Sequence, residues 1–208
     1  MKVEVINKDG QKSGRQIELN DSIFAIEPND HCIYLTVKQY LANQRQGTHK
    51  SLEKSEVSGS TRKLHKQKGT GGARKGSIKN PLYRGGGRIF GPQPRDYSFK
   101  LNKKVKDLAR RSALSYKAKD NEIVVIENFE LTDCKTKSFL QILKNLGLEN
   151  TKTLFVYPSN NKNLELASRN LTKSKTMLAN ELNTYTILNY KNLVFMESSL
   201  DHIPNSEN

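Results

Sequence analysis

The chain contains no long apolar run. Its longest aliphatic stretch, residues 123–126, has four residues, whereas a membrane-spanning helix needs about 20. The residues after Met1 also lack the apolar stretch of a secretory signal peptide. We therefore expect no membrane partner and a cytoplasmic location.

Cysteine is scarce too. Cys32 and Cys134 lie 102 positions apart, a spacing typical of no metal site, so we expect two packing thiols in a reducing compartment. The four histidines are scattered, and no Asp or Glu occurs between residues 57 and 95. The chain thus offers no constellation for general acid–base chemistry, and we expect no enzyme, no cofactor and no metal.

What the chain has in excess is positive charge, concentrated in its middle. The net charge is +14, with 35 Lys and Arg against 21 Asp and Glu. Residues 38–112 hold 20 of these cations and only four acids, while residues 113–208 hold eleven of each. Such an uneven charge indicates a polyanionic partner for the middle and a plain globular scaffold for the rest.

The acid-free stretch, residues 57–95, also contains nine of the 13 glycines and only eight apolar residues. A segment of this composition cannot bury enough surface to offset its ordering entropy. It should be mobile alone, either as a solvated linker or as a segment that becomes ordered on nucleic acid.

The flanking sequence alternates between strand and helix patterns. Strands are expected at 2–6, 15–19, 122–126, 153–157, 176–179 and 193–196, and helices at about 30–46, 102–118, 136–146 and 162–171, with Asn29 and Asn102 as N-caps. Residues 184–190 give a mixed signal. The alternation predicts a three-layer α/β/α domain with a mostly parallel sheet, formed by residues 1–46 and 101–208. Residues 47–100 would then be a long extended basic loop inserted between two helices.

The helix over 102–118 has a basic face. Lys103, Lys106, Arg110 and Lys117 fall within about 60° of each other at 100° per residue. This pattern suits a solvated face as well as one turned towards phosphates.

The glycine clusters do not match a nucleotide-binding loop. A P-loop needs Gly-Lys-Ser/Thr, but Gly76 is followed directly by Ser77; a dinucleotide loop needs a third glycine where Arg74 stands. RNA binding explains the residues better, because Lys and Arg neutralise phosphates and glycine lets the backbone approach them. Tyr83, Phe90 and Tyr97 are spaced where unpaired bases could stack.

The order of the motifs resembles the bacterial-type large-subunit ribosomal protein four family. The resemblance covers about residues 43–115 and rests on Arg45-Gln46-Gly47-Thr48, Gln67-Lys68-Gly69-Thr70-Gly71, Ala73-Arg74, Gly76-Ser77-Ile78-Lys79, Pro81, Arg84-Gly85-Gly86, Pro94-Arg95-Asp96 and Asn102-Lys103-Lys104.

The resemblance implies a structural constituent of the large ribosomal subunit. Such a protein would bind the large-subunit RNA, support early assembly, and line the nascent-polypeptide exit tunnel with its loop tip, beside a loop of the twenty-second large-subunit protein. Its partners would be that RNA, neighbouring ribosomal proteins and the nascent chain. The implied tip residues are His65, Gln67, Lys68, Gly69 and Thr70. The predicted RNA-binding residues are Arg45, Gln46, Lys50, Arg62, Lys63, Lys66, Arg74, Lys75, Lys79, Arg84, Arg88, Arg95, Lys103, Lys106 and Arg110.

Two positions depart from the family pattern. His65 stands where many relatives have Trp, so a smaller, titratable ring replaces the largest stacking surface; Gly72 stands where they often have Arg, so we expect one phosphate contact fewer. The alternative function is a free RNA-binding regulator of the chain's own message.

Overall fold

The computed structural model describes residues 1–204. The chain divides into two compact units, one formed by Met1–Leu41 with the chain from Lys100 onward and the other by Ala42–Phe99. The first unit contains all the strands and nearly all the helical residues, whereas the second has no strand and only the last residues of one helix.

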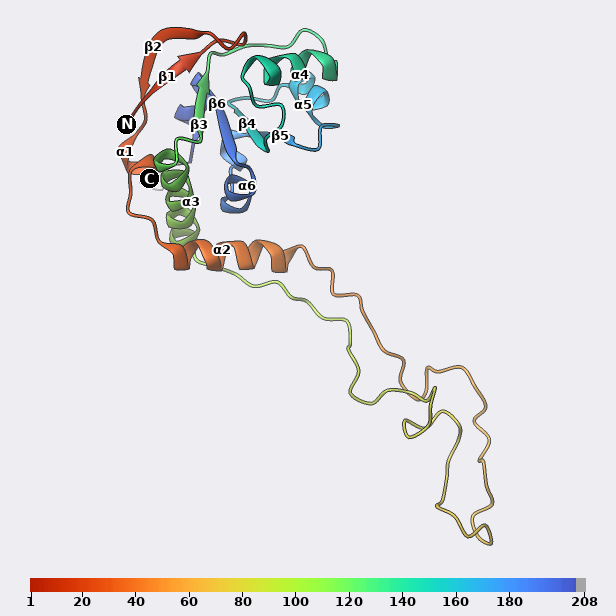
Figure 1. Cartoon of the computed structure of the whole chain (residues 1–208). Helices are drawn as coiled ribbons and strands as arrows, with labels where there is room; N and C mark the ends of the chain where they lie inside the picture. Colours follow the sequence, from red (N-terminus) through yellow and green to blue (C-terminus); the bar gives the residue numbers. More distant parts are fainter. Residues whose placement is uncertain (205–208) are drawn as a thin grey trace. The chain divides into compact units, whose positions relative to one another are not determined.

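The first unit is built on a six-stranded sheet with the order β2-β1-β3-β6-β4-β5 (Figure 1). β1 (Lys2–Ile6) and β2 (Lys12–Glu18) form an antiparallel hairpin, and β2 begins three residues before the expected strand over 15–19. β3 (Ile123–Ile126), β4 (Thr153–Tyr157), β5 (Ser174–Leu178) and β6 (Asn192–Met196) run parallel to β1. The sheet is therefore mostly parallel, and β2 is its antiparallel edge.

Helices cover both faces of this sheet. α1 (Asp21–Phe24), α3 (Lys103–Lys119) and α6 (Thr184–Asn189) enclose one core with Leu114, Leu154 and Phe195. α4 (Thr136–Asn145) and α5 (Lys162–Ser168) enclose a second core with Phe139 and Phe155. The two cores on opposite faces confirm the predicted three-layer α/β/α class, because each apolar face of the sheet needs a helical layer to bury it.

Local hydrogen bonds explain where several helices begin. The Asn29 side chain accepts a bond of 3.0 Å from the Cys32 amide at the start of α2 (Asp30–Asn43), as predicted. Asn102 differs from its prediction, because its side chain makes no capping bond and only its carbonyl accepts the Lys106 amide. α2 also ends at Asn43 and does not continue to residue 46.

The structure contains elements that the sequence patterns did not predict. α1 is a four-residue helix, and η1 (Ala179–Glu181) and η2 (Glu197–His202) are short 3₁₀ helices. The prediction of two packing thiols is wrong for Cys134, which is exposed, while Cys32 is half-buried. Within residues 1–204, no helix is long and apolar enough to span a membrane, and no cluster of His, Cys, Asp or Glu is arranged to hold a metal ion.

Candidate nucleic-acid interface

Ala42–Phe99 forms one doubled-back segment, here called the basic hairpin (Figure 1). Isolated backbone hydrogen bonds join its two limbs at intervals: Arg95 N to Gly47 O (3.2 Å), Ser51 N to Pro92 O (3.0 Å), Arg88 N to Leu52 O (2.9 Å) and Leu64 N to Gly76 O (3.1 Å). These bonds pair residues whose numbers centre near 70, so the outgoing and returning limbs stay in register without forming a β-ladder.

Glycine permits the close approach of the limbs. Gly47 has φ +66°, and a Cβ there would lie 2.0 Å from the Arg95 carbonyl oxygen. A Cβ at Gly87 would lie 2.3 Å from the Lys54 amide nitrogen. Both distances are far inside van der Waals contact, so these two glycines set the spacing of the hairpin limbs.

At the base of the basic hairpin, two of the predicted RNA-binding arginines pack on one aromatic ring. The guanidinium carbons of Arg45 and Arg95 lie 3.7 Å and 4.5 Å from the centre of the Tyr97 ring. The Tyr97 hydroxyl lies 3.1 Å from His49 Nε2. Cation–π attraction therefore holds both arginines in place, and the ring has its own cations as neighbours where we expected a stacked base.

Some predicted RNA-binding cations already have partners in the hairpin. Lys50 donates to the Glu56 carboxylate, and this bond raises the pKa of Lys50 and lowers that of Glu56. Lys63 donates to the Gln67 side chain. These contacts are exposed, so phosphate would have to displace only weak interactions.

All but one of the remaining cations of the hairpin are open to solvent. The exception is Lys79, which is half-buried. Its carbonyl accepts a bond of 3.0 Å from the amide of Gly87, the glycine that packs against Lys54. The exposed predicted residues include the cations Arg45, Arg62, Lys66, Lys68, Arg74, Lys75, Arg84, Arg88 and Arg95, and the neutral Gln46.

The closing turn of the hairpin lies beyond the Leu64–Gly76 bond and spans residues 65–75. It contains the predicted tip residues His65, Gln67, Lys68, Gly69 and Thr70, all exposed. Lys66, Arg74 and Lys75, which are predicted to bind RNA, also lie in this turn.

The three aromatic residues proposed for stacking have different surroundings. Tyr83 has a buried hydroxyl with no partner among the described residues, and Lys75 Nζ lies 5.8 Å from its ring centre. Tyr97 is engaged by two arginines. Phe90 is 97% exposed and lies next to Ile89, which is 64% exposed. Exposure thus makes Phe90 the best placed of the three to meet a base.

The basic face predicted for α3 is only partly open. Lys103 and Lys106 are exposed on its first turn, and they line a hollow of about 270 Å³ with Asn183. Arg110 is half-buried, donates to Asp107 (2.7 Å) and to the Pro204 carbonyl (3.0 Å), and has its pKa lowered mainly by burial.

Lys117 is a clear correction to that basic face. Its side chain is buried and donates to Glu122 (2.6 Å) and to the Lys191 carbonyl (3.0 Å). The periodicity grouped it with Lys103, Lys106 and Arg110 because a helical wheel carries no information about what covers each face.

Sequence reasoning missed two features of this interface. No local pattern indicates that residues 45, 95 and 97 meet, because they are far apart in the sequence. The 90% exposure of Leu82 was also not predicted, because a single apolar residue forms no pattern. The long hairpin is exposed and almost free of acids, and such a concentration of positive charge indicates a polyanionic partner.

Comparison with known proteins identifies the family. The chain belongs to the ribosomal protein L4/L1 family, whose model matches residues 17–206. It is 59% identical over 203 residues to the large ribosomal subunit protein uL4 of Flavobacterium johnsoniae, covering 98% of this chain and 97% of that relative. The uL4 proteins of Parabacteroides distasonis and Porphyromonas gingivalis are 62% and 60% identical over 200 residues, covering 96% of each chain. The family resemblance inferred from the motifs is confirmed, and the family is one of structural ribosomal proteins.

Proposed function

We propose that this chain is a constituent of the large ribosomal subunit in the cytoplasm and that its basic hairpin binds the large-subunit RNA. In this division of labour, residues 47–100 make the inserted RNA contacts, and the globular part formed by residues 1–46 and 101–208 supports them. The observation that carries the proposal is the acid-free stretch of ten Lys and Arg, presented on two limbs that stay paired in a single hairpin.

The stem of the hairpin suits a position between RNA helices. Arg84 and Arg88 are exposed on the returning limb, and the Arg88 amide bonds to the opposite limb at 2.9 Å. The two paired limbs of the hairpin, with their exposed cations, can meet phosphates on both sides, and each contact releases counterions. Lys103 and Lys106 on α3 add a second, smaller basic surface. Early docking of such a hairpin would organise the RNA around it and so support assembly of the subunit.

The closing turn has a different role in the proposal. His65, Gln67, Lys68, Gly69 and Thr70 would line the polypeptide exit tunnel near a loop of the twenty-second large-subunit protein, where the nascent chain passes. Side chains that face a water-filled passage lose few contacts when they are replaced. Their replacement should therefore affect what passes through the tunnel more than assembly.

A free regulator of the chain's own message is the second candidate, because the same exposed cations would also bind a structured messenger RNA. The two roles separate on a sucrose gradient in high salt. A ribosomal constituent co-migrates one-to-one with large subunits, whereas a regulator is found mostly free.

The deciding experiment compares stem and tip. Arg84→Glu combined with Arg88→Glu should slow large-subunit assembly, since it places acids beside phosphates. Lys68→Glu should leave assembly intact and alter stalling by nascent peptides or the action of tunnel-binding antibiotics. The control is Lys137→Glu with Lys175→Glu, two exposed charges on the globular unit. If assembly intermediates accumulated in the Lys68→Glu variant and not in the Arg84/Arg88 variant, the proposed roles of tip and stem would be wrong.

A further inference from the structure

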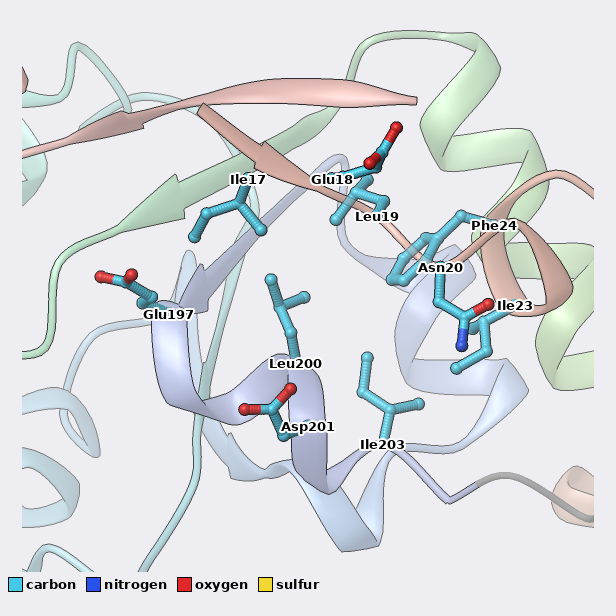
Figure 2. A pocket seen from close by; sticks show the side chains of 10 residues that line it. All are labelled: Ile17, Glu18, Leu19, Asn20, Ile23, Phe24, Glu197, Leu200, Asp201 and Ile203. Atoms are coloured by element: carbon cyan, nitrogen blue, oxygen red, sulfur yellow. The ribbon is translucent and has the colours of Figure 1, made fainter. Parts of the chain in front are cut away.

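The globular unit contains a hollow whose chemistry is opposite to that of the basic hairpin. It is about 440 Å³ in volume and lies between the end of β2, α1 and η2. Figure 2 shows its ten lining residues: the side chains of Ile17, on β2, and Leu19, just after it, point towards Leu200, Glu197 and Asp201 come from η2, and the Glu18 carboxylate points to the other side of β2. We call this hollow the acidic pocket.

The floor of the acidic pocket is apolar. Leu19, Ile23, Phe24 and Ile203 are at most 5% exposed and belong to the core on that face of the sheet, while Ile17 and Leu200 are half-buried. The floor is thus rigid, and it offers contact to an aliphatic side chain rather than to a sugar or a phosphate.

The lining of the pocket carries negative charge that is only partly compensated. Within residues 1–204, neither Glu18 nor Asp201 forms an ion pair, although Lys2 faces Glu18 across the β1–β2 pair. Glu197 lies 3.5 Å from Arg15, whose shorter bond, 2.6 Å, goes to Glu127. The lining includes no cation. The carboxylates of Glu197 and Asp201 beside an apolar floor repel RNA and attract a basic ligand.

We propose that the acidic pocket binds an extended basic segment of a neighbouring ribosomal protein, with a Leu or Ile on the floor and flanking Lys or Arg at the carboxylates. β2 is the edge strand of the sheet, and its residues Ile17 and Glu18 form one wall of the pocket. An extended peptide lying along this edge can therefore reach both the apolar floor and the acidic rim. A ribosomal protein is surrounded by RNA and by other basic proteins, and only the latter complement this pocket.

The test uses the full chain and three fluorescein-labelled peptides in an anisotropy titration at 0.1 M salt. The first probe is Gly-Lys-Arg-Ile-Lys-Leu-Arg-Lys-Gly, the second replaces Ile and Leu with Ser, and the third replaces all Lys and Arg with Gln. We expect saturable binding of the first probe and at least about tenfold weaker binding of the other two, because floor and rim both contribute. The methyl groups of Ile17 and Leu200 should show the largest NMR shifts.

The matched variants keep the fold and change only the charge. Glu197→Gln with Asp201→Asn should weaken the first probe about five- to tenfold, whereas Glu149→Gln with Asp133→Asn, which neutralises two exposed acids outside the pocket, should not. Equal binding by the two double variants, equal binding of the Ser probe, or methyl shifts elsewhere would overturn the proposal. So would a concentration-dependent dimer that buries Leu200. RNA binding should be unchanged in the Glu197/Asp201 variant, so failure of the peptide test leaves the proposed role of the hairpin standing.

Discussion

The guanidinium carbon of Arg45 lies 3.7 Å from the centre of the Tyr97 ring, although 52 positions separate the two residues. Arg95 packs on the same ring at 4.5 Å. One aromatic side chain therefore fixes a cation on each limb where the basic hairpin begins and ends, and the hairpin presents these arginines already ordered.

Replacing Tyr97 should loosen the contact between the two limbs where the basic hairpin begins and ends. Tyr97→Leu removes the ring, so the Arg95 amide, which bonds to the Gly47 carbonyl, should exchange with deuterium faster, and RNA affinity should fall about three- to tenfold. Tyr97→Phe keeps the ring and loses only the contact with His49, so it serves as the control. An affinity loss as large in Tyr97→Phe as in Tyr97→Leu would mean that the hydroxyl, and not the cation–π contact, holds Arg45 and Arg95 in place.

Gly47 and Gly69 form a natural comparison. Both have positive φ, +66° and +81°, but a Cβ at Gly47 would meet the Arg95 carbonyl at 2.0 Å, whereas nothing lies within 4 Å at Gly69. Gly47→Ala should therefore break the Gly47–Arg95 bond and speed exchange of the Arg95 amide, while Gly69→Ala should cost only local backbone strain. Hydrogen exchange followed by mass spectrometry measures both. Similar protection of the Arg95 amide in the two variants would contradict the close packing of Gly47 against Arg95.

Phe90 should contact an unpaired base when the hairpin binds RNA. The chain contains no tryptophan, so Phe90→Trp introduces a single fluorophore at a side chain that is 97% exposed. Stacking should quench and shift its emission on adding RNA, and Phe90→Ala should weaken binding by about 1–3 kcal/mol. The control is Tyr83→Trp, at a partly buried position. Emission that stays that of a solvated indole on saturation with RNA would exclude stacking at residue 90.

The buried pair of Lys117 and Glu122 should stabilise the globular unit. Glu122→Gln leaves the Lys117 ammonium buried beside a neutral group, so the free energy of unfolding should fall by about 1–3 kcal/mol. Glu149→Gln breaks the exposed 3.5 Å pair with Lys144 and should change it by no more than about 0.5 kcal/mol. Urea denaturation followed by circular dichroism gives both values, and equal effects would show that burial adds nothing at Lys117.

Buried, self-contained elements were the most predictable from sequence. β4 spans the predicted residues because Thr153–Tyr157 is an apolar run buried on both faces. α1 escaped prediction because four residues are too few to show a helical period, although Asn20 caps it with a bond to Ser22. The orders of the helices and strands follow from such local patterns.

The predicted interface was less complete, because its contacts join distant residues. The cations of the hairpin were evident from composition, but the internal partners of Lys50, Arg110 and Lys117 depend on packing that no local pattern encodes. The acidic pocket likewise combines residues 17–24 with residues 197–203, and only the fold brings them together.

The most direct test of RNA binding by the basic hairpin is the salt dependence of its affinity. The dissociation constant for a large-subunit RNA transcript should be measured from 0.05 to 0.4 M KCl, for the native chain and for a variant with the ten Lys and Arg of residues 57–95 changed to Gln. We expect a log–log slope of about −4 to −8 for the native chain, and a slope shallower than about −2 for the variant. Equal slopes for the two proteins would contradict the assignment of the hairpin as the RNA-binding surface.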